Sequence, residues 1–125
     1  MGITFTERGD FRNMEAFLAK LNSPNLYSVL SKYGAIGVNA LSNATPVETG
    51  ETASSWYYEI VQAKDYFSIR WYNSHVEEGR PIAVMLQYGH GTGTGGYVQG
   101  IDYINPAMRP VFDAMVDDFW KEVIA

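Results

Sequence analysis

The N-terminal part of the chain combines one alternating pattern with one helical pattern. Ile3–Thr6 alternates between apolar and polar residues, which predicts a short strand. Apolar residues then recur every three or four positions, which predicts a first helix with Asp10 as its N-cap. The apolar positions of this first helix are Phe11, Met14, Leu18 and Leu21.

A second helix is predicted with Ser23 as its N-cap and Pro24 at its first position, because apolar residues from Leu26 to Ala44 follow at helical spacing. Gly34 and Gly37 lie inside it, and each costs the helix roughly 1 kcal/mol relative to alanine. Isolated helix glycines usually have a packing reason. We therefore expect these two to allow close approach of a neighbouring element rather than to form a hinge. Pro46 should end the helix, since proline cannot continue it.

Two strands after Pro46 form the clearest hairpin in the sequence. Residues 54–63 are largely apolar on both faces, so we expect this strand to be covered on both sides. Residues 66–72 alternate regularly. In this second strand the expected core positions are Phe67, Ile69 and Trp71, and the expected outward positions are Ser68, Arg70 and Tyr72.

The C-terminal part contains one ambiguous segment, one strand and one helix. Residues 82–88 form a short apolar run that fits a helix or a strand, whereas Tyr97–Ile104 predicts a strand with a bend at Gly100. Asn105 and Pro106 open a helix with a wide apolar face, and Pro110 is expected in or near its first turn.

The order of these elements predicts a single α+β domain over residues 1–125. Its expected architecture is a small antiparallel sheet packed by two N-terminal helices and one C-terminal helix, with a long glycine-rich loop. The loop is Gln87–Gly100, which holds six of the twelve glycines. Such a run is costly to order, and long loops of this kind usually serve function or stay mobile.

The glycine-rich loop formally contains the pattern G-x-G-x-x-G at residues 91–96. A dinucleotide site would need a helix directly after the loop, but Tyr97–Gln99 predicts a strand. We therefore expect no cofactor at this position. The histidines, His75 and His90, lack the third ligand of a zinc signature, so no metal is expected either.

The composition of the chain argues against several classes of function. The chain has 14 acidic and 9 basic residues and a net charge of −5, which argues against a nucleic-acid-binding surface. It has no cysteine, so disulfides are excluded, and no apolar run approaches the ~18 residues of a membrane span. Glu77 and Glu78 are expected to be a solvated turn. The sequence shows no nucleophile paired with a base, so it does not indicate an enzyme.

Several segments together resemble a known family. Residues 44–50 read A-T-P-V-E-T-G and are followed by Ser54-Ser55-Trp56; residues 86–92 read L-Q-Y-G-H-G-T and are followed by Gly96-Tyr97-Val98 and by Ile104-Asn105-Pro106-Ala107. Together with residues 4–11, T-F-T-E-R-G-D-F, this order is similar to the tail-component or tail-completion proteins of long-tailed double-stranded DNA phages, of the type in phages and prophages of Gram-positive bacteria. The Gly-Thr repeat at residues 93–96 departs from the more varied loop of the family.

The resemblance implies a structural virion protein of the head–tail junction or proximal tail, assembled in the host cytoplasm, and not an enzyme. Relatives form rings, commonly hexameric, that complete the tail or join it to the DNA-filled head. The implied partners are further copies of the chain and other neck or tail proteins: the tail tube, the connector or the stopper. An acidic ring would let DNA pass through its lumen without specific binding.

We expect the glycine-rich loop to form the subunit interface, and to become ordered against a neighbouring subunit or ring. The expected interface residues are Tyr88, Gly89, His90, Gly91, Thr92, Gly93, Thr94, Gly95, Gly96 and Tyr97, and the expected structural turns are at Pro46, Thr49, Gly50, Asn105 and Pro106. An alternative is a module that binds a small ligand or peptide, with Gln87–Gly100 as a lid. That alternative predicts an apolar pocket lined by Tyr88, Tyr97 and Trp71.

Overall fold

A computed structural model describes residues 3–7, 13–19, 26–46, 50–62 and 66–124 of the chain. Its elements in chain order are β1 (Ile3–Glu7), β2 (Asn13–Ala19), α1 (Leu26–Ala44), α2 (Gly50–Ala53), β3 (Trp56–Gln62), β4 (Tyr66–Asn73), β5 (Val76–Glu77), β6 (Arg80–Pro81), α3 (Ile82–Tyr88), β7 (Gly89–Gly91), β8 (Tyr97–Gln99) and α4 (Ile104–Ile124). The α+β class predicted from the sequence is confirmed.

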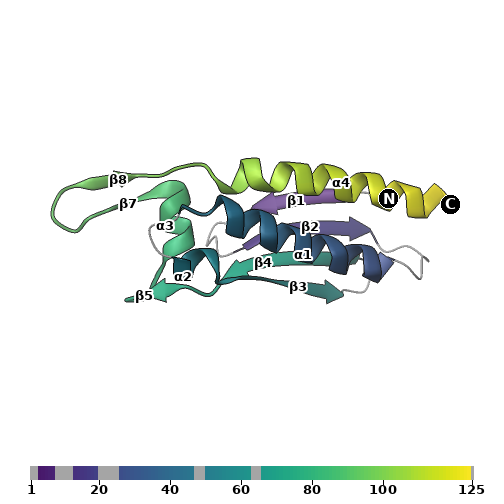
Figure 1. Ribbon diagram of the computed structural model, residues 1–125, viewed down its shortest axis with the longest axis horizontal. Helices are drawn as coiled ribbons and strands as arrows, with labels where there is room; N and C mark the ends of the chain where they lie inside the picture. The colour runs from purple at the N-terminus through teal and green to yellow at the C-terminus, as the bar shows by residue number, and fades with distance from the viewer. Residues whose placement is uncertain (1–2, 8–12, 20–25, 47–49, 63–65, 125) are drawn as a thin grey trace.

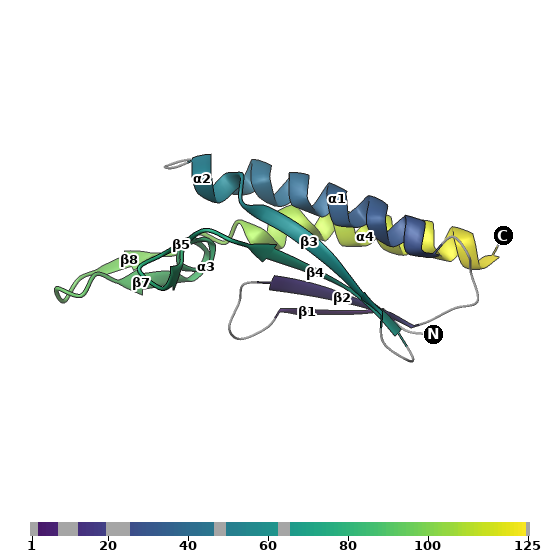
Figure 2. The same ribbon diagram turned by 90° about the horizontal axis from the view of Figure 1, so that it is seen from below.

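The main sheet has four strands in the order β1-β2-β4-β3, and each neighbouring pair is antiparallel. The two long helices, α1 and α4, lie side by side across one face of this sheet (Figure 1). Seen along the sheet, both helices are on the same side of the strands (Figure 2). The domain therefore has two layers, with its core between the helices and one sheet face.

The first predicted helix is wrong, because Asn13–Ala19 is strand β2. Met14 and Leu18 are four positions apart, and this spacing satisfies the two-residue repeat of a strand as well as the helical repeat. Pairing decides between them, since β2 hydrogen-bonds to β1 on one side and to β4 on the other. The remaining positions of that prediction, Asp10, Phe11 and Leu21, lie outside the described residues.

The hairpin predicted after Pro46 is confirmed as β3 and β4. Ile69 and Trp71 are fully buried, as predicted, whereas Ser68 is buried although it was expected to face outward. The side chain of Phe67 lies outside the described residues. The expected cover on both sides of β3 is wrong for the isolated chain: Tyr57 is 48 % exposed and stacks on Tyr72 of β4, with ring centroids 5.3 Å apart.

The two glycines of α1 have the packing role predicted for them. A Cβ on Gly37 would lie 2.7 Å from Cε2 of Trp71, and a Cβ on Gly34 would lie 2.8 Å from Cγ of Tyr58. The absence of side chains here lets two sheet aromatics approach the helix backbone. Trp71 Nε1 then donates a hydrogen bond to the carbonyl oxygen of Gly34, at 3.0 Å.

A polar contact joins α1 to α4 at the edge of the core. The Tyr33 hydroxyl donates to Oδ2 of Asp118, and Lys32 Nζ lies 3.1 Å from the same oxygen. Burial, together with the neighbouring Asp118 carboxylate, raises the pKa of Tyr33 to about 12. The hydrogen bond from Tyr33, and then that from Lys32, lower the pKa of Asp118. The contact is therefore strongest with a neutral phenol and an ionised carboxylate.

The C-terminal helix begins earlier than predicted. Because α4 starts at Ile104, Pro106 occupies its first turn, while Pro110 lies inside the helix. The expectation that Pro110 sits near the helix start is therefore wrong, and the helix loses one backbone hydrogen bond there. The predicted strand Tyr97–Ile104 is also shorter, since β8 ends at Gln99. The ambiguous run over residues 82–88 is helix α3.

Candidate functional site

The glycine-rich segment forms a hairpin that projects beyond the ends of the long helices (Figure 1). Strands β7 and β8 pair antiparallel, with His90 opposite Val98. At the tip, the backbone N–H of Thr92 donates to the carbonyl oxygen of Gly96 at 3.0 Å, and Thr92 Oγ1 accepts from the Gly96 N–H at 3.2 Å. The segment is thus a hairpin within the single chain, and its shape does not need a neighbouring subunit.

Glycine is required at both ends of this hairpin, for different reasons. At the tip, Gly93 and Gly95 have φ values of 81° and 88°, which other residues rarely adopt. At the base, a Cβ on Gly89 would lie 2.5 Å from the carbonyl oxygen of Val98, and one on Gly100 would lie 2.6 Å from the Gly89 nitrogen. At the base of the hairpin, the backbone segments at Gly89 and Gly100 approach each other too closely for either residue to carry a side chain.

Gln87 anchors the hairpin to the start of α4. Its Oε1 accepts hydrogen bonds from the backbone N–H groups of Tyr103 and Ile104, at 3.0 and 2.9 Å. Its Nε2 donates to Oδ1 of Asp102 at 2.7 Å. The first N–H groups of a helix have no partner within the helix, so this buried amide acts as a cap from a distant segment. The segment is therefore fixed at both of its ends.

Two further hydrogen bonds hold α3 against the residues that lead into α4. The Tyr103 hydroxyl donates to the carbonyl oxygen of Ala83 at 2.7 Å, and burial raises the pKa of this phenol. The backbone N–H of Ile101 donates to the carbonyl oxygen of Leu86 at 2.9 Å. These bonds make α3 and the start of α4 a rigid base from which the hairpin extends.

The hairpin and its base expose apolar side chains. Tyr97 is 67 % exposed and Ile101 is 61 % exposed, and Tyr88 and Val98 are exposed as well. Residues 89–100 contain no acidic or basic side chain other than His90. An exposed, uncharged and partly aromatic projection suits contact with another protein. It does not provide the converging acid and base groups that catalysis requires.

The structure brings the ten predicted interface residues together in the last turn of α3 and the hairpin that follows. The predicted turn residues lie elsewhere: Pro46 follows α1, Gly50 begins α2, and Thr49 lies outside the described residues. Asn105 and Pro106 are in the first turn of α4, where Asn105 Nδ2 donates to Oδ1 of Asp102 at 3.1 Å.

Sequence reasoning missed the roles of Gln87 and Asp102, which connect the hairpin to the body of the domain. The available signal was a polar side chain within the apolar run 82–88. Once that run is a helix, Gln87 is buried next to Ala83, four residues earlier on the same helix face. A buried amide needs partners, so its position would have suggested a cap.

The pocket expected for a ligand-binding module is not formed. Trp71 is fully buried beneath α1, whereas Tyr97 is exposed on the hairpin, so the two cannot line one pocket with Tyr88. The described residues do form an open pocket of about 550 Å³ elsewhere. It is lined by Glu77, Glu78, Arg80, Ile82 and Met85, so its rim is largely charged.

No family model, no curated protein and no solved structure matches this chain. Among the described helices, none has the length and apolarity needed to cross a membrane. The functional interpretation consequently depends on the geometry of the hairpin and on the residues of the chain itself.

Proposed function

We propose that this chain is a structural subunit of the head–tail junction of a long-tailed double-stranded DNA phage, where it assembles into a ring. The observation that carries the proposal is the projecting β7–β8 hairpin, anchored by the buried amide of Gln87. Rigid attachment lowers the entropy that a contact segment loses on binding. Such an arm is suited to reach a neighbouring copy of the chain or the adjacent ring.

The open face of the main sheet supports the same proposal. In the described part of the chain, helices cover only one face (Figure 2). The other face carries the stacked pair Tyr57 and Tyr72, which is aromatic and partly exposed. Aromatic residues are enriched at protein interfaces, because they bury a large area for few rotatable bonds. A neighbouring subunit would supply the cover that the sequence led us to expect for β3.

The element order also agrees with the segments that resemble the phage family. The motif at residues 44–50 follows the long helix α1 and precedes the β3–β4 hairpin. The second group of motif segments, between residues 86 and 107, covers the end of α3, the β7–β8 hairpin and the start of α4. The proposed ring would be hexameric, which is the common copy number in the phage family that these segments resemble. Its net negative charge would allow DNA to slide through the lumen, because basic contacts to phosphates would hold it.

The test is incorporation of the chain into virions. We would purify virions from cells carrying the gene, quantify the chain by mass spectrometry and image the head–tail junction with the chain labelled. The wild-type chain is expected at the junction in a ring of equal subunits. Its absence from virions, or a strictly monomeric chain that binds a metabolite, would overturn the proposed function.

The role of the hairpin is tested by the double variant Val98→Asp and Ile101→Asp. Both side chains are exposed, so the isolated chain should keep its circular dichroism spectrum and its melting temperature. We expect incorporation to fall at least tenfold, because two carboxylates would be desolvated in the interface. The matched control, Ser28→Asp and Ala35→Asp on the exposed face of α1, adds the same charge elsewhere and should be incorporated normally. Normal incorporation of the hairpin variant would exclude the hairpin as the contact.

A further inference from the structure

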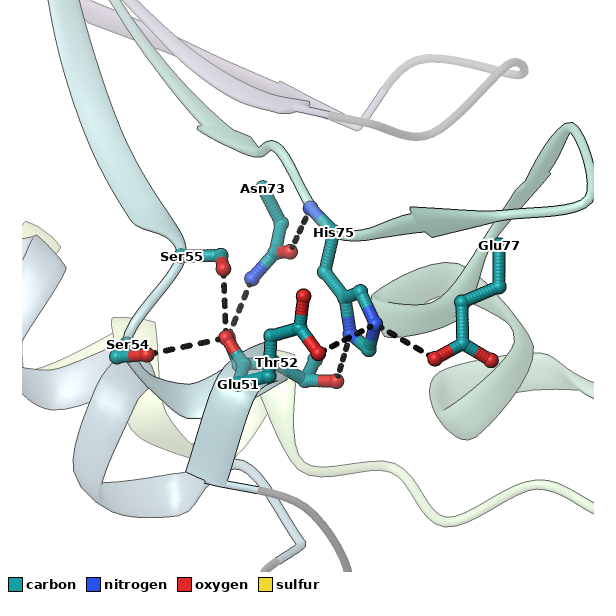
Figure 3. A network of polar contacts seen from close by, with 7 residues as sticks. All are labelled: Glu51, Thr52, Ser54, Ser55, Asn73, His75 and Glu77. Atoms are coloured by element: carbon teal, nitrogen blue, oxygen red, sulfur yellow. Dashed lines mark hydrogen bonds and ion pairs between the residues drawn. The ribbon is translucent and has the colours of Figure 1, made fainter.

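We propose that Glu51, His75 and Glu77 form a binding site for a divalent transition-metal ion, with Zn²⁺ as the best-fitting candidate. Each of the three side chains offers one ligand atom, and these atoms all lie within 4.8 Å of one another. Glu51 belongs to α2, His75 lies between β4 and β5, and Glu77 is the last residue of β5; the three converge at one end of the main sheet (Figure 3). The inference is independent of the proposed assembly.

The spacing of the ligand atoms fits a coordination sphere. His75 Nε2 lies 3.0 Å from Oε1 of Glu77 and 3.5 Å from Oε2 of Glu51. With metal–ligand bonds of about 2.1 Å, adjacent ligands are separated by roughly 3.0 Å in an octahedral site and 3.4 Å in a tetrahedral one. Both carboxylates are on exposed side chains, so a small rotation brings their oxygens to the same spacing.

His75 is held in position by contacts on its other side. Its side chain is almost completely buried, and Nδ1 lies 2.6 Å from Oγ1 of Thr52. Its backbone N–H donates to Oδ1 of Asn73 at 2.9 Å, while Asn73 Nδ2 donates to the carbonyl oxygen of Thr52 at 2.8 Å. A carboxylate only accepts, so in this arrangement Nε2–H donates to Oε1 of Glu77 at 3.0 Å and Nδ1 accepts from the Thr52 hydroxyl. Metal binding would move the ring proton to Nδ1, which would then donate to Oγ1 of Thr52, and Nε2 would be free to bind the ion.

The chemistry of the ligands selects the class of metal. Mg²⁺ and Ca²⁺ prefer oxygen ligands alone, whereas an imidazole nitrogen with carboxylates suits Zn²⁺ and its neighbours in the first transition row. Two carboxylates would neutralise the charge of a divalent ion, and the net charge of −5 favours cations in general. With three protein ligands, water would complete the coordination.

A bound ion would join segments that are distant in sequence. Glu51 belongs to α2, which follows the long helix, and Glu77 belongs to β5, whose partner β6 leads directly into α3. The metal would therefore cross-link the end of the helical layer to the base of the hairpin. Its expected effect is structural, so metal removal should lower the melting temperature.

The experiment uses the full chain, free of any affinity tag and dialysed against a chelator. Isothermal titration with ZnCl₂ should show one ion per chain and a rise in melting temperature that excess EDTA reverses; MgCl₂ should give no comparable binding. Co²⁺ in place of Zn²⁺ should give visible absorption bands that report an imidazole–carboxylate environment.

The variants Glu51→Gln and Glu77→Gln change exposed ligands and leave the buried His75 in place, so folding is preserved. Each should weaken Zn²⁺ binding at least tenfold, and the double variant should remove both the calorimetric signal and the cobalt spectrum. Glu78→Gln is the matched control, since Glu78 is exposed beside Glu77 and contributes no ligand. The absence of stoichiometric Zn²⁺ binding in the wild-type chain, or unchanged binding in the double variant, would overturn the proposal.

Discussion

Replacing Gly37 with alanine tests the close packing of α1 on the sheet. A new Cβ would lie 2.7 and 2.9 Å from two ring carbons of Trp71, well inside the ~3.5 Å contact distance of carbon atoms. Trp71 is fully buried and donates a hydrogen bond to the Gly34 carbonyl oxygen, and its ring centroid lies 6.0 Å from that of Phe112 on α4. The indole therefore has no free space into which it could retreat.

Two opposing effects set the size of the change. Alanine is a better helix former than glycine by about 1 kcal/mol, which favours the variant. Overpacking a well-filled core costs about 1–3 kcal/mol, and the hydrogen bond of Trp71 to Gly34 contributes about 1 kcal/mol that the displacement would remove. The unfavourable effects dominate, so we expect Gly37→Ala to lower the free energy of unfolding by about 1–3 kcal/mol.

Urea unfolding followed by tryptophan fluorescence measures this change by linear extrapolation. Gly50→Ala is the matched control, because Gly50 is exposed in α2 and a Cβ there would meet no atom within 4 Å. It should leave the midpoint unchanged or raise it slightly. A midpoint for Gly37→Ala at or above that of the wild type, with the same m value, would show that the packing argument is wrong.

Two further predictions concern the hairpin anchor and the contact between the long helices. Gln87→Met keeps the side-chain volume but leaves the N–H groups of Tyr103 and Ile104 without their acceptor, which should cost about 1–3 kcal/mol and speed their hydrogen exchange; unchanged exchange at both amides would refute the capping role. Folding favours the neutral phenol of Tyr33, so its contribution to stability is present below its ordinary pKa of 10 and is lost as pH rises toward 12. Tyr33→Phe should therefore show a smaller loss of stability between pH 10 and 12, measured by urea unfolding, and an identical slope would contradict this assignment.

Regular local patterns were sufficient to predict much of the fold. The apolar repeat of α1, the alternation of β4 and the wide apolar face of α4 are each contained within one segment, so periodicity identified them. The prediction failed for β2, where Met14 and Leu18 fit two repeats at once and strand pairing made the choice. Pro110 failed for a different reason: the helix start was predicted within one residue, but a proline beyond the first turn was tolerated at the loss of one backbone hydrogen bond.

In the candidate sites, too, some features follow from the local sequence and others from contacts between distant segments. The glycines of residues 89–100 identified a special backbone by composition alone, and the hairpin is formed within that segment. Gln87 acquires its role only when the chain returns to place Tyr103 and Ile104 beside it. Likewise, His75 has no ligand partner nearby in sequence except Glu77, and only the packing of α2 brings Glu51 to it. Periodicity and backbone preference act between near neighbours, so the sequence by itself determined α1, β4, α4 and the glycine-rich segment. Caps, strand partners and ligand sets join residues far apart in the chain, and these were decided by the tertiary structure.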